Sequence, residues 1–428
     1  MKLRSNVKIV LFTLVFVLFS IMSVQAVTLE VMDSVIVESP EREALLQIIE
    51  NFEEENPDIT IDYQGVPMND AYAQIPTLAT SGALPDVYLA TLDFIGTFED
   101  MGIATDLRDV FSQEYLDGFN QNSLSELTVD GKVLAHPFFV IPMGVLYRID
   151  WFEEKGLTPP ETWEEFLDIA NELTEDTNGD GSVDRWGFAM LASRDGSGGS
   201  RFIQIFRTFG GYELRLNDEG EYVTDVNTPQ GRNAFEFFTE LNTEHEVVPP
   251  GPMEVSYGEA LNLMATNKTA MMVTGPHSIG GIIERNPELD GKIGAFPLPM
   301  AQDGGKHISV LNTYGHAINP DSDKKEEAAK FLKFLVNDES ALLWNEMTGR
   351  MPTRTGLLQS PEVQDRPDLA GFVEAMDYAE PLPTVSYYST IMTDILPSAY
   401  QSIIVGQATV EEAAERAEER IISLIEEN

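Results

Sequence analysis

A loop between residues 176 and 184 is rich in the oxygen-bearing side chains that hard cations such as calcium prefer. Its candidate ligands, at alternating positions, are Asp176, Asn178, Asp180, Ser182 and Asp184. Gly181 stands at the sixth position, where an EF-hand loop needs glycine, but Gly187 stands at the twelfth, where that loop carries a bidentate glutamate. The spacing therefore predicts either a weak calcium site, completed by a carboxylate from elsewhere, or a polar turn between a helix and a strand.

A second group of polar residues follows two predicted strands near the start of the chain. Asp33 and Ser34 come after an apolar strand over 27–32, and residues 91–93 follow a strand over 86–90. Between them, the pattern predicts a helix, a strand over 59–63 and a helix over 70–80. This alternation is typical of a parallel, doubly wound sheet, whose strands bind ligands at their carboxyl ends.

The first of these helices has clear start, face and stop signals. Ser39 and Pro40 have the residue types of an N-cap and a first helical position. Asn56 and Pro57 stop the helix. Its apolar residues recur with helical spacing and predict one buried face, made by Leu45, Ile48, Ile49 and Phe52.

A second α/β region follows. Extended runs over 131–140 and 145–147 precede a capping box, Thr162 with Glu165, that opens a helix. Strands are predicted around 186–191 and 271–274, with extended segments at 309–312 and 317–319. The stretch 196–200 contains only glycine and serine, so it predicts a mobile loop that faces solvent or a cleft. A last capping box, Thr409 with Glu412, opens an acidic C-terminal helix.

Composition excludes several classes of function. The chain has 428 residues, 71 acidic and 27 basic side chains, and a net charge of −44. Proteins that bind nucleic acids need basic side chains to neutralise phosphates, so this charge argues against nucleic acid as a partner. The chain has no cysteine, which excludes disulfides, thiolate metal sites and cysteine nucleophiles.

The first 26 residues have the pattern of a signal peptide. Lys2, Arg4 and Lys8 precede an apolar run over 9–22, and small residues at Val24 and Ala26 suit a signal peptidase. The apolar run is short for a membrane span. No cysteine follows the cleavage site to carry a lipid anchor. The sequence therefore predicts an exported protein that is free in a periplasm, with secretion or an uncleaved anchor helix as the alternatives.

Several segments, taken together, resemble one known family. They are NFEEENPDITIDY, ATSGALPDVYLA, VLYRIDWFEEKGLTPPETWEEFLDIA, GDGSVDRWGFAM, AMMVTGPHSIGG, GHAINPDSDKKEEAAKFLKFLVNDESALLWNEMTGRMPTRTG and GQATVEEAAERAEERI. Their order and spacing are similar to those of the family 1 extracellular solute-binding proteins, the carbohydrate receptors of ABC importers typified by the maltose-binding protein. The resemblance covers nearly the whole chain after residue 26.

The resemblance implies a two-lobe α/β fold of the type II periplasmic-binding-protein kind, with doubly wound sheets joined by three hinge crossings. Lobe one is expected to hold residues 27–138 and 313–345, and lobe two residues 139–312 and 346–428. The crossings map to 136–142, 309–313 and a segment within 345–352. Hinges of this kind let ligand close the cleft between two rigid lobes.

The resemblance also implies ligand-binding residues. Asp93 matches a family carboxylate that bonds sugar hydroxyls, or else is a solvated loop residue. Tyr387 and Tyr388 lie near a family aromatic that stacks on sugar, or else pack between the lobes. His277 follows Gly275 and Pro276, where the family often has tryptophan. That difference puts ligand size in doubt. Further candidates, each with a structural alternative, are Arg201, Phe202, Tyr314 and Arg350.

The expected function is that of a monomeric substrate-binding component, without catalytic activity, that delivers a mono- or oligosaccharide to an ABC permease. Two alternatives remain open: a receptor for another solute, such as a polyol phosphate or a peptide, and a secreted glycoside hydrolase with two carboxylates. The chain has none of the short motifs G-x-S-x-G, H-E-x-x-H, G-x-G-x-x-G or the Walker loop. No cofactor is expected beyond calcium at 176–184.

Overall fold

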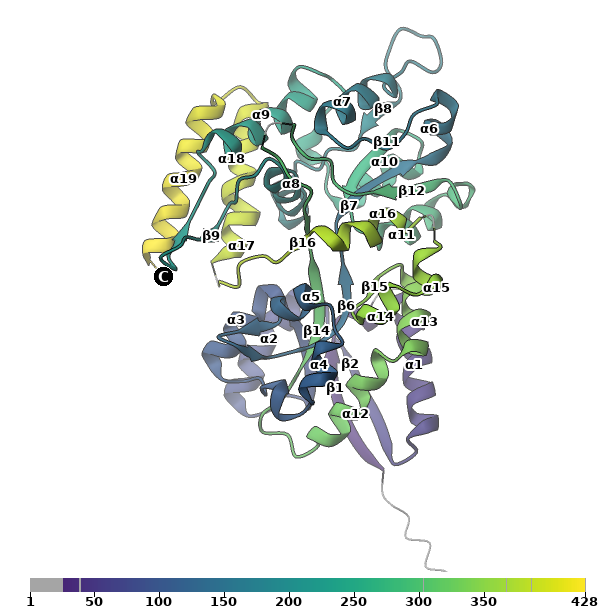
Figure 1. Ribbon diagram of the computed structural model, residues 1–428, viewed down its shortest axis with the longest axis vertical. Coiled ribbons are helices and arrows are strands. Elements are labelled where there is room, and N and C mark those ends of the chain that lie inside the picture. Colours follow the sequence, from purple (N-terminus) through teal and green to yellow (C-terminus); the bar gives the residue numbers. More distant parts are fainter. Residues whose placement is uncertain (1–25, 38–39, 303, 367, 386, 428) are drawn as a thin grey trace, which may run out of the picture.

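The computed structural model describes residues 26–37, 40–302, 304–366, 368–385 and 387–427. These residues form two α/β regions, each built around its own main sheet (Figure 1). The predicted signal segment, except for Ala26, lies outside the described residues. Among the helices of the described part, none combines the length and the apolar character needed to cross a membrane.

The first region is built on a six-stranded sheet. In spatial order its strands are β15 (Met351–Pro352), β6 (His136–Ile141), β14 (Asn312–Ile318), β3 (Val87–Thr91), β1 (Val27–Asp33) and β2 (Ile59–Gly65). β1 pairs in parallel with both β2 and β3, as the strand and helix alternation predicted. β14 runs antiparallel to both of its neighbours. The sheet therefore gathers strands from distant parts of the chain.

Helices cover this sheet. They are α1 (Glu41–Glu55), α2 (Met68–Ser81), α3 (Leu92–Met101), α4 (Gln113–Asp117), α5 (Gln121–Glu126), α12 (Lys325–Leu335) and α13 (Asp338–Thr348). The predicted apolar face of α1 is buried, and Phe52 packs edge-on against Phe331 of α12. α1 ends before Asn56, as predicted, while Pro40 is its N-cap and Ser39 lies outside the described residues.

The second region is built on a four-stranded mixed sheet. In spatial order its strands are β12 (Ile293–Phe296), β7 (Gly144–Arg148), β11 (Thr269–Thr274) and β8 (Trp186–Phe188). β7 is antiparallel to both neighbours, and β11 is parallel to β8. Two-stranded ribbons are formed by β4 (Thr128–Val129) with β5 (Lys132–Val133), and by β9 (Arg215–Leu216) with β10 (Tyr222–Val223).

The helices of the second region are α6 (Ile149–Lys155), α7 (Trp163–Glu172), α8 (Gly196–Thr208), α9 (Pro229–Thr243), α10 (Tyr257–Ala265), α11 (Ser278–Arg285), α16 (Ala370–Ala375), α17 (Tyr388–Thr390), α18 (Leu396–Ile404) and α19 (Val410–Glu427). The capping box of Thr162 and Glu165 opens α7 as predicted. Thr409 and Glu412 make the same reciprocal bonds at the start of α19.

The chain passes between the two main sheets three times (Figure 1). β6 continues into β7, and β13 (Ser309–Val310) leads into β14. After β15 the chain runs through α14 (Thr355–Leu358) and α15 (Pro361–Gln364) to α16. Because β15 still pairs with β6, the third passage follows Pro352 rather than lying within 345–352. The predicted boundary at 345 is therefore too early, because Met351 and Pro352 still belong to the six-stranded sheet. The boundaries at 138 and 312 stay a prediction.

The glycine and serine segment at 196–200 is helical, so the prediction of a mobile loop was wrong. Asp195 caps α8, and its carboxylate accepts hydrogen bonds from the backbone N–H groups of Ser197 and Gly198. A Cβ atom at Gly198 or Gly199 would collide with the carbonyl oxygens of Ser193 and Met392. The glycines therefore let this helix end pack closely against two neighbouring backbone segments.

Candidate functional site

A cavity of about 390 Å³ lies where the first two passages between the sheets meet. Ile141 and Met143 of the first passage and residues 310–312 of the second line it. Leu92, at the start of α3, lines it from the six-stranded region. The second region contributes α8 together with Tyr257, His277, Leu382 and Met392. The cavity is thus bounded by both regions and by the segments that connect them.

One face of α8 supplies most of the polar lining of this cavity. Its members, spaced as neighbours on a helical face, are Ser197, Ser200, Arg201 and Gln204. Asp195 is the N-cap of α8 and fixes the first turn of this helix, but it does not line the cavity. Burial alone would raise the pKa of Asp195, yet hydrogen bonds from Ser197, Gly198 and Ser193 lower it below its ordinary value.

Arg201 lies in the cavity wall without a carboxylate partner among the described side chains. Its Nη1 donates to Ser200 Oγ at 3.0 Å, and its Nη2 donates to Thr274 Oγ1 at 3.3 Å. Its Nε is buried and has no hydrogen-bond partner. Burial lowers the pKa of Arg201, and the negative charge of Asp195 and the Tyr257 hydroxyl oppose that shift. The guanidinium stays protonated at neutral pH.

His277 and Tyr257 form an aromatic pair beside Arg201. Their rings are stacked with centroids 5.5 Å apart, and the Arg201 guanidinium lies 5.3 Å from the centre of the Tyr257 ring. Burial lowers the pKa of His277 well below its ordinary value, and the charges of Arg350 and Arg201 lower it further. His277 is therefore a neutral ring, and its Nδ1 is buried without a partner.

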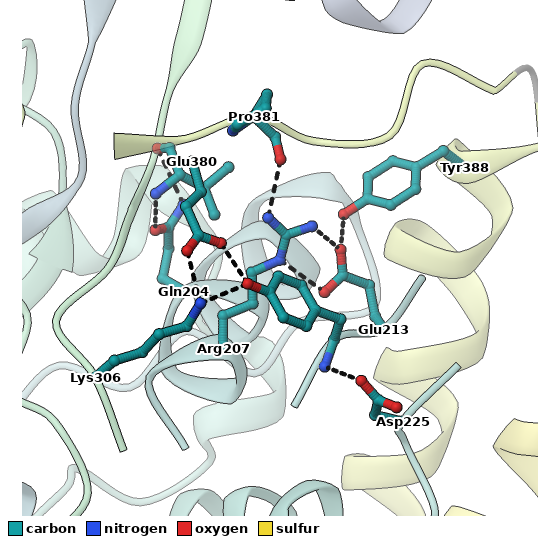
Figure 2. A network of polar contacts seen from close by, with 10 residues as sticks. Gln204, Arg207, Glu213, Asp225, Lys306, Glu380, Pro381 and Tyr388 are labelled. Atoms are coloured by element: carbon teal, nitrogen blue, oxygen red, sulfur yellow. Dashed lines mark hydrogen bonds and ion pairs between the residues drawn. The ribbon is translucent and has the colours of Figure 1, made fainter. Parts of the chain in front are cut away.

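Gln204 connects α8 to the second passage (Figure 2). Its Oε1 accepts from Val310 N at 2.9 Å, and its Nε2 donates to Val310 O at 3.4 Å. β13, which contains Val310, pairs in parallel with β16 (Ala379–Glu380). A residue of the cavity wall thus holds the segment that leads into β14.

A buried charge network continues from the same helix end (Figure 2). Arg207 makes a two-pronged ion pair with Glu213, with N–O distances of 3.0 and 2.6 Å, and both side chains are almost fully buried. Arg207 also donates to the Pro381 carbonyl oxygen at 3.1 Å. Burial alone would lower the pKa of Arg207, but Glu213 raises it. This pair fixes the chain just before Leu382, which lines the cavity.

Asp33 is the centre of a buried polar network in the six-stranded region. Its carboxylate accepts from Tyr63 Oη at 2.8 Å and also contacts Tyr314 Oη and His316 Nε2. Burial alone would raise the pKa of Asp33, but His316 and the two tyrosine hydroxyls lower it. The Tyr314 hydroxyl also lies 2.7 Å from Ser34 Oγ. Tyr314 is therefore a buried support of the strand ends and does not line the cavity.

The other predicted ligand-binding residues have varied positions. Asp93 is the second residue of α3, next to Leu92 of the cavity, and its side chain lies outside the described part. Phe202 is fully buried in the core of the second region. Arg350 forms an ion pair with Glu41, and its guanidinium lies 5.2 Å from the centre of the Phe139 ring.

Tyr387 and Tyr388 do not line the cavity. The Tyr387 ring packs edge-on against Tyr222, with centroids 6.5 Å apart. Tyr388 is buried, and its hydroxyl donates to the Glu213 carboxylate (Figure 2). Of the eight residues that the sequence singled out, the structure therefore brings only Arg201 and His277 together in the described wall of the cavity.

The loop at 176–184 is closed by hydrogen bonds within itself. Asp176 accepts from Gly179 N and Gly181 N, each at 2.7 Å, and Asp184 accepts from Thr177 N at 2.9 Å. A Cβ atom at Gly187 would collide with the backbone of Ala170, so the twelfth position cannot carry a carboxylate. Among the described residues, no group of three or more His, Asp or Glu side chains is arranged to hold a metal ion. Calcium binding stays a prediction.

Sequence reasoning missed Ser197, Ser200 and Gln204 of the cavity because it treated 196–200 as a loop. A helix beginning at residue 196 would have placed these polar side chains on one face together with Arg201. Tyr257 and Met392 gave no local signal of this kind, because only the tertiary fold brings them to the cavity.

Comparison with known proteins assigns this arrangement of two sheets to a class. The bacterial extracellular solute-binding protein family matches residues 38–342. A maltose/maltodextrin-binding domain from Bdellovibrio bacteriovorus, bound to maltotriose, is 26% identical, with a TM-score of 0.74, and covers 94% of this chain and 100% of that chain. A solute-binding protein from Thermotoga lettingae, bound to tagatose, has a TM-score of 0.79 at 24% identity, over 94% of this chain and 100% of that one.

These similarities define the fold as the two-lobe, type II fold of periplasmic binding proteins, with three hinge crossings. Among curated proteins, the maltodextrin-binding protein MdxE of Bacillus subtilis is 22% identical over 403 residues, which span 92% of this chain and 89% of that protein. The chain belongs to the bacterial extracellular solute-binding protein family.

Proposed function

We propose that this protein is the substrate-binding component of an ABC importer and that it captures a carbohydrate in the cavity between its two regions. The observation that carries the proposal is the position of the cavity, which is lined by two of the three connecting passages. Ligand held there touches the segments that must rotate when the lobes close, so binding and closure are coupled. Relatives that bind maltodextrin and maltotriose support the choice of carbohydrate.

The chemistry of the wall suits a sugar. Hydroxyl, amide and guanidinium groups on α8 can bond to hydroxyls, and the Tyr257–His277 pair offers an aromatic surface for an apolar ring face. The volume of about 390 Å³ falls within the range of roughly 300–1,000 Å³ that is usual for small-molecule pockets.

Binding proceeds without turnover in this proposal. A glycoside hydrolase needs two carboxylates on either side of the scissile bond. None of the described side chains that line the cavity is aspartate or glutamate. Asp93 would supply at most one carboxylate to the opposite wall, which suffices for a hydrogen bond to a sugar hydroxyl but not for acid and base catalysis together.

The remaining parts of the proposal follow from the family. The protein acts as an exported monomer in the periplasm and hands its sugar to a membrane permease. Membership of the extracellular solute-binding family supports the location outside the cytoplasm, and the signal-peptide pattern at residues 1–26 supports export.

A thermal-shift screen tests the proposal, because a ligand that binds only the native state raises the melting temperature. The panel holds neutral mono- and oligosaccharides, sugar acids, polyol phosphates and short peptides, and a product assay accompanies each hit. We expect stabilisation by sugars and recovery of the sugar unchanged. Stabilisation only by polyol phosphates or peptides, or release of hydrolysis products, would contradict the proposal.

A further inference from the structure

The charge balance around the cavity is uneven. Arg201 has two hydroxyl partners and no carboxylate within ion-pair distance among the described side chains. Its neighbours Ser197, Ser200 and Thr274 are neutral. The charge of Asp195 acts on Arg201, but that carboxylate already accepts four hydrogen bonds at the N-cap of α8. Among the described side chains, the positive charge at the wall therefore has no direct counter-charge.

The other basic groups near this wall do not add to that charge. Arg350 is neutralised by its ion pair with Glu41. His277 is a neutral imidazole, because burial and the two neighbouring arginines disfavour its protonation. Among the described side chains, the wall thus offers one guanidinium without a carboxylate partner, within a chain of net charge −44.

The N–H groups of Arg201 that have no acceptor among the described residues indicate which kind of ligand group would bind there. A guanidinium has five N–H donors in a planar fork, and Ser200 and Thr274 accept only two of them. Arg201 is partly buried, and its Nε is buried without a hydrogen-bond partner. Desolvating such a guanidinium without an anionic partner costs free energy, and a carboxylate that meets the fork in two-pronged geometry reduces that cost. Neutral hydroxyls would satisfy the hydrogen bonds but not the charge.

We infer that the cavity takes a carbohydrate that bears a carboxylate, as in a uronic acid, and that Arg201 forms the ion pair with this carboxylate. The inference rests on the proposed carbohydrate function and narrows its substrate class. One guanidinium balances one negative charge, which suits a carboxylate. A phosphate monoester carries about −1.5 to −2 at neutral pH and would leave uncompensated negative charge in an already acidic protein.

The test uses pairs of sugars that differ only by oxidation of the terminal CH₂OH to a carboxylate. The probes are glucose with glucuronate and galactose with galacturonate, as monomers and as linear trimers, and glucose 6-phosphate is the phosphorylated arm. Calorimetric titration of the full chain should show the acid bound about ten- to a hundredfold more tightly than its neutral partner. This preference should weaken as salt is added.

Single-residue variants test whether Arg201 causes the preference for the acidic sugar. Arg201→Gln should abolish the preference for the acid, so that the acid and its neutral partner bind with similar and weaker affinity, and Arg201→Lys, which keeps the charge but lacks the fork, should keep part of the preference. Arg285→Gln is the matched control, because Arg285 is an exposed residue of α11 that bonds the Gly281 carbonyl oxygen outside the cavity. It should leave the preference intact. Circular dichroism and unliganded melting curves check that each variant is folded.

The outcomes separate the two proposals. Equal affinity for acid and neutral partners, or a preference that survives Arg201→Gln, overturns the carboxylate inference and leaves the carbohydrate function standing. Preferential binding of glucose 6-phosphate overturns it in favour of a phosphate. If no sugar in the panel binds while peptides or polyol phosphates do, the proposed function itself fails, and the inference fails with it.

Discussion

Helix α8 carries two arginines whose surroundings are opposite. Arg207, near its C-terminal end, pairs with the buried carboxylate of Glu213 and also bonds the Pro381 carbonyl oxygen. Arg201, less than two turns earlier, meets only hydroxyl groups and an aromatic ring. The same residue type on one helix is thus satisfied by the protein at one position and left for a ligand at the other.

The surroundings of the two arginines distinguish a structural role from a ligand-binding role without the use of sequence motifs. A satisfied buried ion pair holds chain segments together, and here it joins α8 to the segment before Leu382. A partly buried cation without a carboxylate partner among the described side chains, such as Arg201, contributes no such bond, and its desolvation raises the free energy of the unliganded state. The two arginines should therefore respond in opposite ways to removal of their charges.

The largest effect is expected at Glu213. Glu213→Gln leaves the buried guanidinium of Arg207 without its counter-charge, so the free energy of unfolding should fall by about 3–5 kcal/mol. Urea denaturation measures this change. The double variant Arg207→Met with Glu213→Leu should recover most of it, because an apolar pair replaces both charges. A loss below about 1 kcal/mol in the single variant would contradict the structural role of this pair.

The contrasting variant is Arg201→Gln in the absence of ligand. Since Arg201 has no counter-charge to lose, the free energy of unfolding should stay within about 0.5 kcal/mol of wild type or rise. A loss comparable to that of Glu213→Gln would show that Arg201 has a structural partner, and the comparison between the two arginines would fail.

The opposite wall of the cavity supplies the next prediction. Asp93 follows Leu92, which lines the cavity, at the start of α3, and we predict that its carboxylate accepts hydrogen bonds from sugar hydroxyls. Asp93→Ala should weaken sugar affinity by about 1.5–3 kcal/mol and hardly change the melting temperature. Calorimetry and thermal melts on the same variant distinguish this role. Unchanged affinity with lowered stability would make Asp93 a capping residue.

The stability of the six-stranded region should depend on pH through Asp33. Burial alone would raise the pKa of Asp33, but the charge of His316 and the hydrogen bonds from His316, Tyr314 and Tyr63 together outweigh burial and lower it in the folded protein. Stability from this group is present above the ordinary pKa of 3.8 and is lost as pH falls through the folded value. Unfolding measured between pH 5 and pH 2 should therefore be less pH-dependent in Asp33→Asn. Equal slopes in both proteins would contradict the lowered pKa.

The smallest effect is expected at the loop over 176–184. Calcium at ten times its dissociation constant would stabilise the folded protein by about 1.4 kcal/mol, measured as a shift in melting temperature after removal of metal by chelator. Asp180→Asn should abolish the shift, because the Asp180 carboxylate is a candidate ligand and, within the loop, accepts a hydrogen bond only from Ser182 N. Melting curves that do not respond to calcium would make this loop an ordinary polar turn.

Local rules predicted much of the fold. The apolar face of α1, the stop at Asn56 and the capping box of Thr162 with Glu165 depend on neighbouring residues alone, and the structure confirms them. The start of α8 was missed because glycine has low helix propensity, while the deciding contacts of Gly199 come from Met392, which is distant in sequence.

The residues that line the cavity were harder to predict, because contacts between segments distant in the sequence decide which side chains reach it. His277 could be found because it lies in the segment AMMVTGPHSIGG, which resembles the family, and Arg201 because it follows the glycine and serine stretch at 196–200. Helical spacing could have placed Gln204 on the same face as Arg201, but its contact with Val310, and the position of Tyr257 beside the Arg201 guanidinium, depend on tertiary packing. Tyr388 gave a misleading signal, since its hydroxyl serves the buried Glu213 carboxylate rather than the cavity.

Calorimetric titration of a stabilising sugar into wild-type protein and into Ser200→Trp tests most directly the claim that the cavity binds a carbohydrate. Ser200 lines the cavity from α8, so an indole at this position would fill the space that the sugar needs. The account predicts one sugar bound per chain in the wild type, recovered unchanged, and no measurable binding in the variant when circular dichroism shows it to be folded. Undiminished binding in Ser200→Trp would place the sugar elsewhere and contradict the account.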